Sequence, residues 1–255
     1  GDRRRAGPGV SRIIVDGLEW EVRVRGAGAP LLLLHGFTGR GSGWGSHATA
    51  FARWFRVILV DLPGHGRSGI PADPARASVE RTAADLATLL HGLNGAPANV
   101  VGYSLGARIA LALAVDHPAV VRRLVLESPS AGIAQAAERA ARREADARLA
   151  ERLEAAGIEA FVEHWEQQPV FASHARLPAR GAARLRAERL ANRPTGLATS
   201  LRGAGQGSMR PLHDRLAAIR ASTLVIAGAL DPAGRERAEA VAAGIPAARL
   251  EVIAG

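Results

Sequence analysis

A serine held between two glycines is the residue of this chain best suited to do chemistry. It lies in Gly102-Tyr103-Ser104-Leu105-Gly106, a G-x-S-x-G pentapeptide. An apolar run at 99–101 precedes the pentapeptide, and a helix-forming run at 107–115 follows it. A strand that turns abruptly into a helix lifts the serine oxygen clear of the sheet, and only glycine fits beside so tight a turn. The pattern predicts a nucleophile elbow with Ser104 at its tip.

A serine of this kind needs a histidine to take its proton and a carboxylate to orient that histidine. Asp231 is the carboxylate candidate, because it follows the apolar run 223–228 at the carboxyl end of a predicted strand, where ligands bind in such sheets. The alternative role for Asp231 is to cap a helix that begins near Pro232. We favour the catalytic role, in the chain order serine, acid, histidine.

The histidine of the triad is harder to place. All eight histidines precede Asp231, and the sequence ends just past the last predicted strand, 249–253. One interpretation is that the triad histidine follows Gly255, a few residues beyond the given sequence. The other is that a different histidine takes its place, for which the candidates are His213, His174 and His164. We favour the first, since these three lie in or beside a segment where surface or substrate-facing roles are expected.

Two backbone N–H groups are expected to form an oxyanion hole beside the serine. They belong to Leu105, which follows the serine, and to Phe37, which follows a short predicted strand. His35 is expected to support this loop by hydrogen bonding. Asp61 and His65, in a D-x-P-G-H-G-x-S run, are expected to form a turn.

The elements that must position these residues alternate along the chain. Residues 11–25 alternate apolar and polar side chains around Asp16-Gly17, which predicts a β-hairpin. Further apolar runs predict strands, and residues 78–90 have helical spacing behind a serine cap. The remaining predicted strands are at 31–34, 55–60, 99–101, 123–127, 223–228 and 249–253. Apolar strands that alternate with helices predict an α/β fold with a mostly parallel sheet and helices on both faces.

The alternation breaks at residues 130–209, which are rich in Ala, Arg and Glu and contain no convincing strand. We interpret them as a helical lid inserted above the serine, between core segments 1–129 and 210–255. The run 203–208, Gly-Ala-Gly-Gln-Gly-Ser, is expected to be a flexible return from the lid to the sheet.

Composition limits the class of partner. The chain has 255 residues and a net charge of +9, and all 33 of its basic residues are arginine. Codon preference explains most of this bias, but an anionic substrate is the sharper alternative, because guanidinium groups grip carboxylates in bidentate fashion. Nucleic acid is a poor candidate, since the arginines are scattered and aromatic residues make up 4% of the chain.

The sequence also bears on compartment and cofactors. It contains no cysteine, so no disulfide or thiolate metal site is expected, and the spacing of Asp, Glu and His predicts no metal site. No apolar stretch approaches the roughly 18 residues of a spanning helix. The basic start at residues 1–5 is not followed by an apolar region, so no signal peptide is predicted and a cytoplasmic location is expected.

These features resemble the α/β-hydrolase family over nearly the whole chain. Four runs narrow the resemblance to the menaquinone-pathway 2-succinyl-6-hydroxy-2,4-cyclohexadiene-1-carboxylate synthases. They are Gly102-Tyr103-Ser104-Leu105-Gly106-Ala107-Arg108, Glu138-Arg139-Ala140-Ala141-Arg142, Trp165-Glu166-Gln167-Gln168-Pro169-Val170-Phe171 and Arg189-Leu190-Ala191-Asn192. The W-x-Q-Q-P-V-F run is the most specific of them.

The resemblance implies a lyase that acts on a small polycarboxylate and needs no cofactor. Ser104 would remove a proton next to a succinyl ketone, and the enolate oxygen would rest between the Phe37 and Leu105 amides. Pyruvate would then leave as the ring gains a double bond. An oxyanion hole stabilises an enolate as well as a tetrahedral intermediate.

The resemblance also assigns substrate-binding residues, each with a plainer alternative. Arg108, Arg142 and Arg189 would bind carboxylates, while Tyr103 and Trp165 would line the pocket and donate hydrogen bonds. A surface ion pair is the alternative for Arg108, and a solvated helix face is the alternative for Arg142. Arg184 or Arg186 could take the place of Arg189, and Trp165 could simply anchor the lid.

Two other functions remain open from the sequence. A serine hydrolase acting on esters or carbon–carbon bonds would use the same triad under a more apolar lid. A non-catalytic member would bind a ligand in the pocket, and the missing histidine is the one feature that favours it. The arginines at 108, 142 and 189 favour the lyase over an enzyme for neutral esters.

Overall fold

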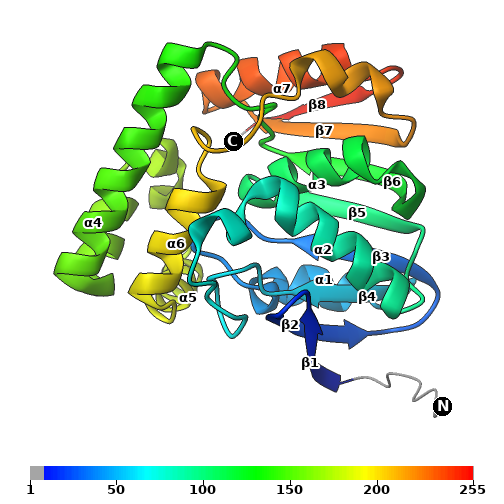
Figure 1. Ribbon diagram of the computed structural model, residues 1–255, viewed down its shortest axis with the longest axis horizontal. Coiled ribbons are helices and arrows are strands. Elements are labelled where there is room, and N and C mark those ends of the chain that lie inside the picture. The colour runs from blue at the N-terminus through cyan, green and yellow to red at the C-terminus, as the bar shows by residue number, and fades with distance from the viewer. Residues whose placement is uncertain (1–8, 255) are drawn as a thin grey trace.

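The computed structural model describes residues 9–254, so the basic start at residues 1–5 and Gly255 lie outside the described residues. An eight-stranded sheet runs through the molecule in the order β1-β2-β4-β3-β5-β6-β7-β8 (Figure 1). β1 and β2 form an antiparallel hairpin, β2 is antiparallel to β4, and the other neighbours are parallel. The strands are β1 (Gly9–Val15), β2 (Leu18–Arg25), β3 (Ala29–Leu34), β4 (Phe55–Val60), β5 (Ala98–Tyr103), β6 (Val121–Glu127), β7 (Ser222–Gly228) and β8 (Arg249–Ile253). This confirms the α/β prediction.

Helices cover the sheet on both faces. They are α1 (Gly45–Phe51), α2 (Val79–Gly92), α3 (Leu105–Asp116), α4 (Ala136–Glu166), α5 (Ala179–Leu190), α6 (Pro194–Ala204) and α7 (Pro232–Gly244). Ser78 caps α2 as predicted, with its hydroxyl accepting a hydrogen bond from the Arg81 amide at 3.3 Å. No helix among residues 9–254 is long and apolar enough to cross a membrane.

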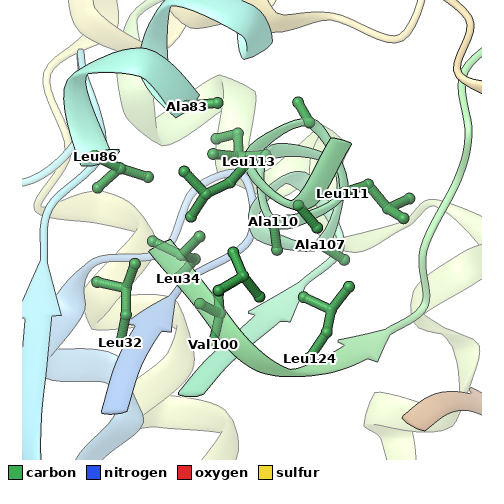
Figure 2. Packing of buried hydrophobic residues seen from close by; sticks show 14 of the residues in the cluster. Leu32, Leu34, Ala83, Leu86, Val100, Ala107, Ala110, Leu111, Leu113 and Leu124 are labelled. Atoms are coloured by element: carbon green, nitrogen blue, oxygen red, sulfur yellow. The ribbon is translucent and has the colours of Figure 1, made fainter. Parts of the chain in front are cut away.

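The central helix α3 is buried along nearly its whole length. Every residue from Leu105 to Val115 is buried, and all of them except Arg108 are apolar or glycine, as expected for a helix in the core. Its small side chains let it lie close to the sheet. Figure 2 shows this packing, with side chains of α3 and α2 above those of β3, β5 and β6. The labelled residues are Leu32, Leu34, Ala83, Leu86, Val100, Ala107, Ala110, Leu111, Leu113 and Leu124. This packed core gives the nucleophile elbow a rigid base.

The segment between β6 and β7 forms helices that lie beyond the ends of the strands (Figure 1). We call residues 130–209 the insertion. Its helices α4 and α6 pack on one another through a separate apolar cluster. This cluster consists of Ala150, Leu153, Ile158, Phe161, Val162, Leu197, Ala198 and Leu201. α4 bends at Gly157, whose φ of 82° and ψ of 178° are not helical, and this kink lets its second half approach the core.

One local prediction was wrong. Gly203 and Ala204 do not belong to a flexible return, because they form the last turn of α6 and are buried. A Cβ on Gly203 would lie 2.0 Å from the carbonyl oxygen of Pro74. The glycine is therefore needed for close packing of α6 against the core.

Candidate active site

The elbow places Ser104 between the end of β5 and the start of α3. Its φ of 52° and ψ of −107° are unusual for a residue with a side chain. Backbone hydrogen bonds hold it on both sides, since its amide donates to the Glu127 carbonyl at 2.9 Å and its carbonyl accepts from the Arg108 amide at 3.1 Å. Ser104 is only partly buried. The structure thus has the strained, accessible serine that a nucleophile elbow requires.

The glycines around Ser104 fill positions that no larger residue could occupy. A Cβ on Gly102 would lie 2.4 Å from the Gly106 carbonyl oxygen, and one on Gly106 would lie 2.2 Å from that of Leu34. A Cβ on Gly36 would lie 2.8 Å from the Tyr103 ring and 3.4 Å from the Cβ of Ser104. The loop that follows β3 therefore runs directly past the serine.

The two predicted oxyanion donors lie on this loop and on the elbow. The amide of Phe37 follows Gly36, and the amide of Leu105 opens α3. Neither amide donates a hydrogen bond to an acceptor within residues 9–254. Free donors at a helix start and a neighbouring loop can stabilise negative charge that develops beside the serine.

His35 supports the oxyanion loop from below. Its Nδ1 donates to the Gly36 carbonyl at 2.8 Å, and its Nε2 accepts from the Leu62 amide at 3.0 Å. These partners fix the neutral tautomer with the proton on Nδ1. Burial lowers the pKa of His35 to about 4, so the ring is neutral at neutral pH.

The turn after β4 packs beneath the same loop. Asp61 accepts hydrogen bonds from the amides of Gly41 at 2.7 Å and Arg67 at 2.8 Å, as expected for a turn former. His65 is fully buried, with its ring centroid 5.1 Å from that of His35 and 5.7 Å from that of Phe37. Burial, and after it the neighbouring His35, lower the pKa of His65 to about 3.

Asp231 lies where the sequence predicts, after β7 and at the start of α7. Its carboxylate accepts a hydrogen bond from the Gly234 amide at 2.9 Å and is 4.0 Å from the Arg237 guanidinium. The strand that precedes Asp231, β7, is separated from the elbow strand β5 by β6 alone, and all three strands are parallel. Burial, and after it the charge of Glu127, raise the pKa of Tyr103. The charge of Asp231 makes a smaller contribution in the same direction. The helix-capping role is thus observed, and the catalytic role stays a prediction.

The candidate substitute histidines make local contacts. His164 is 3.3 Å from the Gln168 amide nitrogen, and the ring centroid of His174 is 5.0 Å from that of Phe171. His213 begins a short 3₁₀ segment before β7. Within residues 9–254, no histidine hydrogen-bonds to the side chain of Ser104 or of Asp231. A triad histidine beyond Gly255 remains our prediction.

Arg108 and Arg142 come together where the insertion returns to the core. Arg108 is buried, and its Nη1 donates to the Ala204 carbonyl at 2.6 Å. Burial, and then the charge of Arg142, lower the pKa of Arg108 to about 10, so it is still protonated at neutral pH. Arg142 is half-exposed and donates to Asp146 at 2.9 Å and to Gln206 at 3.4 Å.

Arg189 lies in a second cluster, on α5. It is 4% exposed, donates to Glu166 at 2.9 Å, and has its guanidinium carbon 4.9 Å from the centroid of the Phe171 ring. Its buried Nε has no partner within the described residues. Burial raises the pKa of Tyr103, and the charge of Arg189 partly offsets this effect.

Trp165 connects this second cluster to the oxyanion loop. Its ring meets Phe37 edge-on at 5.4 Å, stacks on Phe161 at 5.6 Å and lies 5.5 Å from Phe171, measured between centroids. Its indole N–H is buried without an acceptor in the part of the chain that the structure describes. Buried donors without partners are rare in folded proteins. Trp165 Nε1 and Arg189 Nε can therefore serve a ligand that brings acceptors.

Two residues that contribute to the candidate site were given no role from the sequence. Phe161 packs against both Phe37 and Trp165, and its position on a helical apolar stripe gave no sign of this. Asn192 joins the insertion to the oxyanion loop by hydrogen bonds. Asn192 stands in the Arg189-Leu190-Ala191-Asn192 run of the family resemblance, but no role was assigned to it there, and a polar residue just after a helix usually indicates only a helix cap.

Comparison with known proteins adds independent information. Residues 29–255 match the family described as alpha/beta hydrolase fold. A Bacillus subtilis (strain 168) protein provisionally named 2-succinyl-6-hydroxy-2,4-cyclohexadiene-1-carboxylate synthase is 35% identical over 96% of this chain and 89% of its own. A Klebsiella pneumoniae (strain 342) protein of the same name is 38% identical over 72% of each chain. The structure of MenH from S. aureus superposes with a TM-score of 0.87 at 32% identity, covering 92% of this chain and 89% of that one.

Proposed function

We propose a function for this chain from the premise that it belongs to the α/β hydrolase fold family and, within it, to the 2-succinyl-6-hydroxy-2,4-cyclohexadiene-1-carboxylate synthases. It is a lyase that eliminates pyruvate from 2-succinyl-5-enolpyruvyl-6-hydroxy-3-cyclohexene-1-carboxylate. The product is 2-succinyl-6-hydroxy-2,4-cyclohexadiene-1-carboxylate, an intermediate of menaquinone biosynthesis. The cytoplasmic location expected from the sequence is part of this proposal.

The reaction begins with removal of a proton from the ring carbon next to the succinyl ketone. Ser104 takes this proton after passing its own to a histidine that Asp231 orients, the histidine being expected beyond Gly255. The electron pair forms an enolate, whose oxygen accepts hydrogen bonds from the Phe37 and Leu105 amides. As the ketone forms again, the pair moves through the ring double bond and breaks the carbon–oxygen bond to the enolpyruvyl group. The enolate of pyruvate leaves, and the ring has become a diene.

Cations must hold the carboxylates of this substrate, because charges in a partly dry site need partners. Arg189 is the best placed, because it is buried, lies over the Phe171 ring, and has a buried Nε without a partner among residues 9–254. Trp165 and Tyr103 would add hydrogen-bond donors for the same substrate. Arg108 and Arg142 form the second cationic cluster and would bind another carboxylate of the substrate.

One observation carries this proposal. A strained serine is joined by two amides that have no acceptor within residues 9–254, and Trp165, which packs on Phe37, leads through Phe171 to the buried Arg189. The Trp165 indole N–H and the Arg189 Nε have no acceptor in that same range. A general esterase needs the serine and the amides, but it does not need buried cations for its substrate. The fold alone would not distinguish these activities.

The test compares two reactions of the purified full-length protein, because the histidine of the proposed mechanism is expected beyond Gly255. Pyruvate release is measured by coupling to lactate dehydrogenase and NADH, with the conjugated diene followed by its absorbance. Hydrolysis of 4-nitrophenyl acetate is measured in parallel. Release of pyruvate and diene in equal amounts, with much slower ester hydrolysis, supports the lyase. Fast ester hydrolysis without pyruvate would establish the serine hydrolase, and substrate binding without turnover would establish a binding protein.

A further inference from the structure

Asn192 connects the insertion to two loops of the core. It lies between α5 and α6 and is 4% exposed. Its Nδ2 donates to the Thr38 carbonyl at 2.7 Å, and its Oδ1 accepts from the Gly66 amide at 3.1 Å. Thr38 follows Phe37, whose amide is one of the two oxyanion donors. One side chain therefore holds both the oxyanion loop and the turn packed beneath it.

The hydrogen-bonding capacity of Asn192 is used on every side. The second N–H of Nδ2 points to the carbonyls of Glu188 at 3.2 Å and Arg189 at 3.3 Å. Three carbonyl oxygens surround the nitrogen and one N–H faces the oxygen, so the orientation of the amide is determined by its partners. The position of Asn192 therefore requires a side chain that both donates and accepts hydrogen bonds, and few side chains of this size do both.

The oxyanion loop needs such an external contact. Thr38 is buried and has a φ of 67°, in the left-handed region that a β-branched residue rarely adopts. Backbone in such a conformation persists only when its surroundings hold it. The hydrogen bond from Asn192 to the Thr38 carbonyl acts on the strained residue itself. A relaxed Thr38 would let the loop that carries the Phe37 amide shift relative to Ser104.

We propose that Asn192 is a positioning residue that holds the Phe37 amide in the oxyanion hole, an inference that rests on the proposed function. It acts through Thr38 and does not contact the reacting atoms. Because its Nδ2 also binds the Arg189 carbonyl, Asn192 sets the distance between the oxyanion hole and the cation that grips the substrate.

The insertion has other attachments next to Asn192, which makes a clean test possible. Arg193 donates to the Ser68 carbonyl. The backbones of Gly196 and Gly64 meet so closely that a Cβ on Gly196 would lie 2.1 Å from the Gly64 carbonyl oxygen. Removing the Asn192 side chain therefore frees the oxyanion loop while the insertion stays seated.

The first experiment compares Asn192→Ala with its neighbour Arg193→Ala, a matched variant that loses a contact to the turn at 61–68 and keeps the hydrogen bond from Asn192 to Thr38. Pyruvate release should show kcat reduced about 10- to 100-fold in Asn192→Ala, with KM changed less than about threefold, since an oxyanion hole acts on the transition state. Amide hydrogen exchange over residues 36–40 should become faster in this variant. Arg193→Ala should leave kcat and the exchange over 36–40 within about twofold of the parent.

The second experiment uses Asn192→Asp, which keeps the shape of the side chain. An ionised carboxylate would face three carbonyl oxygens, so burial and these neighbours raise its pKa. The protonated acid can donate to Thr38 and still accept from Gly66. The kcat of the variant, divided by that of the parent at each pH, should therefore rise as the pH falls. Simple damage to the insertion would give a ratio that does not change with pH.

The outcomes separate this inference from the proposed function. A parent protein that releases no pyruvate refutes the proposed function, while the exchange comparison still tests the role of Asn192. Unchanged exchange over 36–40 in Asn192→Ala overturns the positioning role, as does a loss confined to KM. Equal losses in Asn192→Ala and Arg193→Ala also overturn it, because they would reflect general loosening of the insertion. If Asn192→Ala does not fold, the pH response of Asn192→Asp decides.

Discussion

The core side and the insertion side of the site are held together by different means. On the core side, Ser104 and the two amides are fixed by backbone hydrogen bonds, close glycine contacts and a fully buried helix. On the insertion side, Trp165 and Arg189 depend on stacked aromatic rings and an ion pair. In α5, Arg189 is the one buried residue, and no residue of the 3₁₀ segment Pro169–Arg176 is buried.

This contrast indicates a division of labour. The core side supplies chemistry that many substrates could share, and its geometry must be exact to within a fraction of an ångström. The insertion side supplies recognition, and a segment with few buried apolar contacts can change its side chains at little cost in stability. Substitutions on the core side should therefore affect turnover or folding, and those on the insertion side should affect substrate binding.

The largest expected effect is that of Ser104→Ala. Without the hydroxyl no group takes the substrate proton, so kcat should fall by at least about 10³-fold. The thermal midpoint should stay within a few degrees of the parent, because Ser104 is only partly buried. Circular dichroism and the pyruvate assay measure the two quantities. Ser128→Ala is the matched control, since Ser128 also has a positive φ, 49°, and lies outside the proposed machinery. Substantial turnover by Ser104→Ala would remove the serine from the mechanism.

Gly106→Ala should damage the core side through folding. The added methyl group would lie 2.2 Å from the Leu34 carbonyl oxygen and 2.8 Å from that of His35. Neither backbone atom can move without shifting β3 or α3, so we expect a loss of roughly 3 kcal/mol or more in unfolding free energy. Urea denaturation measures this loss. A variant as stable as the parent would show that the elbow is looser than the structure indicates.

Acid should weaken the core side through its two buried histidines. The pKa values of His35 and His65 are lowered to about 4 and 3, whereas a histidine in the unfolded chain titrates near 6.5. Between pH 6.5 and these lowered pKa values, the unfolded chain binds protons that the folded chain does not. The contribution of each neutral histidine to the unfolding free energy is therefore fully present above pH 6.5 and is lost as the pH falls. The slope is on the order of 1.4 kcal/mol per pH unit for each histidine. Urea midpoints from pH 7 to pH 5 measure it. His65→Asn should have a shallower dependence, and an unchanged slope would contradict the assignment.

Arg189→Ala should separate recognition from turnover. Loss of the buried guanidinium should raise KM for the substrate about 10- to 100-fold and reduce kcat less. Arg184→Ala is the control, because Arg184 is exposed on the same helix. It is also one of the arginines that could take the place of Arg189 in the family resemblance. Steady-state pyruvate release gives both parameters. A larger effect of Arg184→Ala would mean that the sequence resemblance was aligned on the wrong arginine.

The same contrast explains how much the sequence could predict. The strand predicted at 55–60 has the observed bounds of β4, and the strand at 249–253 has those of β8, because short apolar runs between turn signals are local features. The elbow was predicted for the same reason. The insertion was predicted as a helical lid above the serine, with Arg142, Trp165 and Arg189 toward the substrate, but without its internal contacts. Its kink at Gly157 and the hydrogen bond between Asn192 and Thr38, which are 154 residues apart, depend on partners that no local pattern contains.

The smallest effect is expected for Gly181→Ala, which makes the same substitution as Gly106→Ala at a glycine on the insertion side. Gly181 lies inside α5, where an added Cβ would have its nearest neighbour 4.0 Å away, at Pro178. Because alanine favours the helix over glycine and nothing blocks the methyl group, Gly181→Ala should stabilise the protein by about 0.5–1 kcal/mol or leave it unchanged. Urea denaturation beside Gly106→Ala measures both. The same substitution then destabilises one side of the site and is tolerated on the other. A large loss of stability in Gly181→Ala would show that α5 is packed as tightly as the elbow, and the division between a rigid core side and an adaptable insertion side would fail.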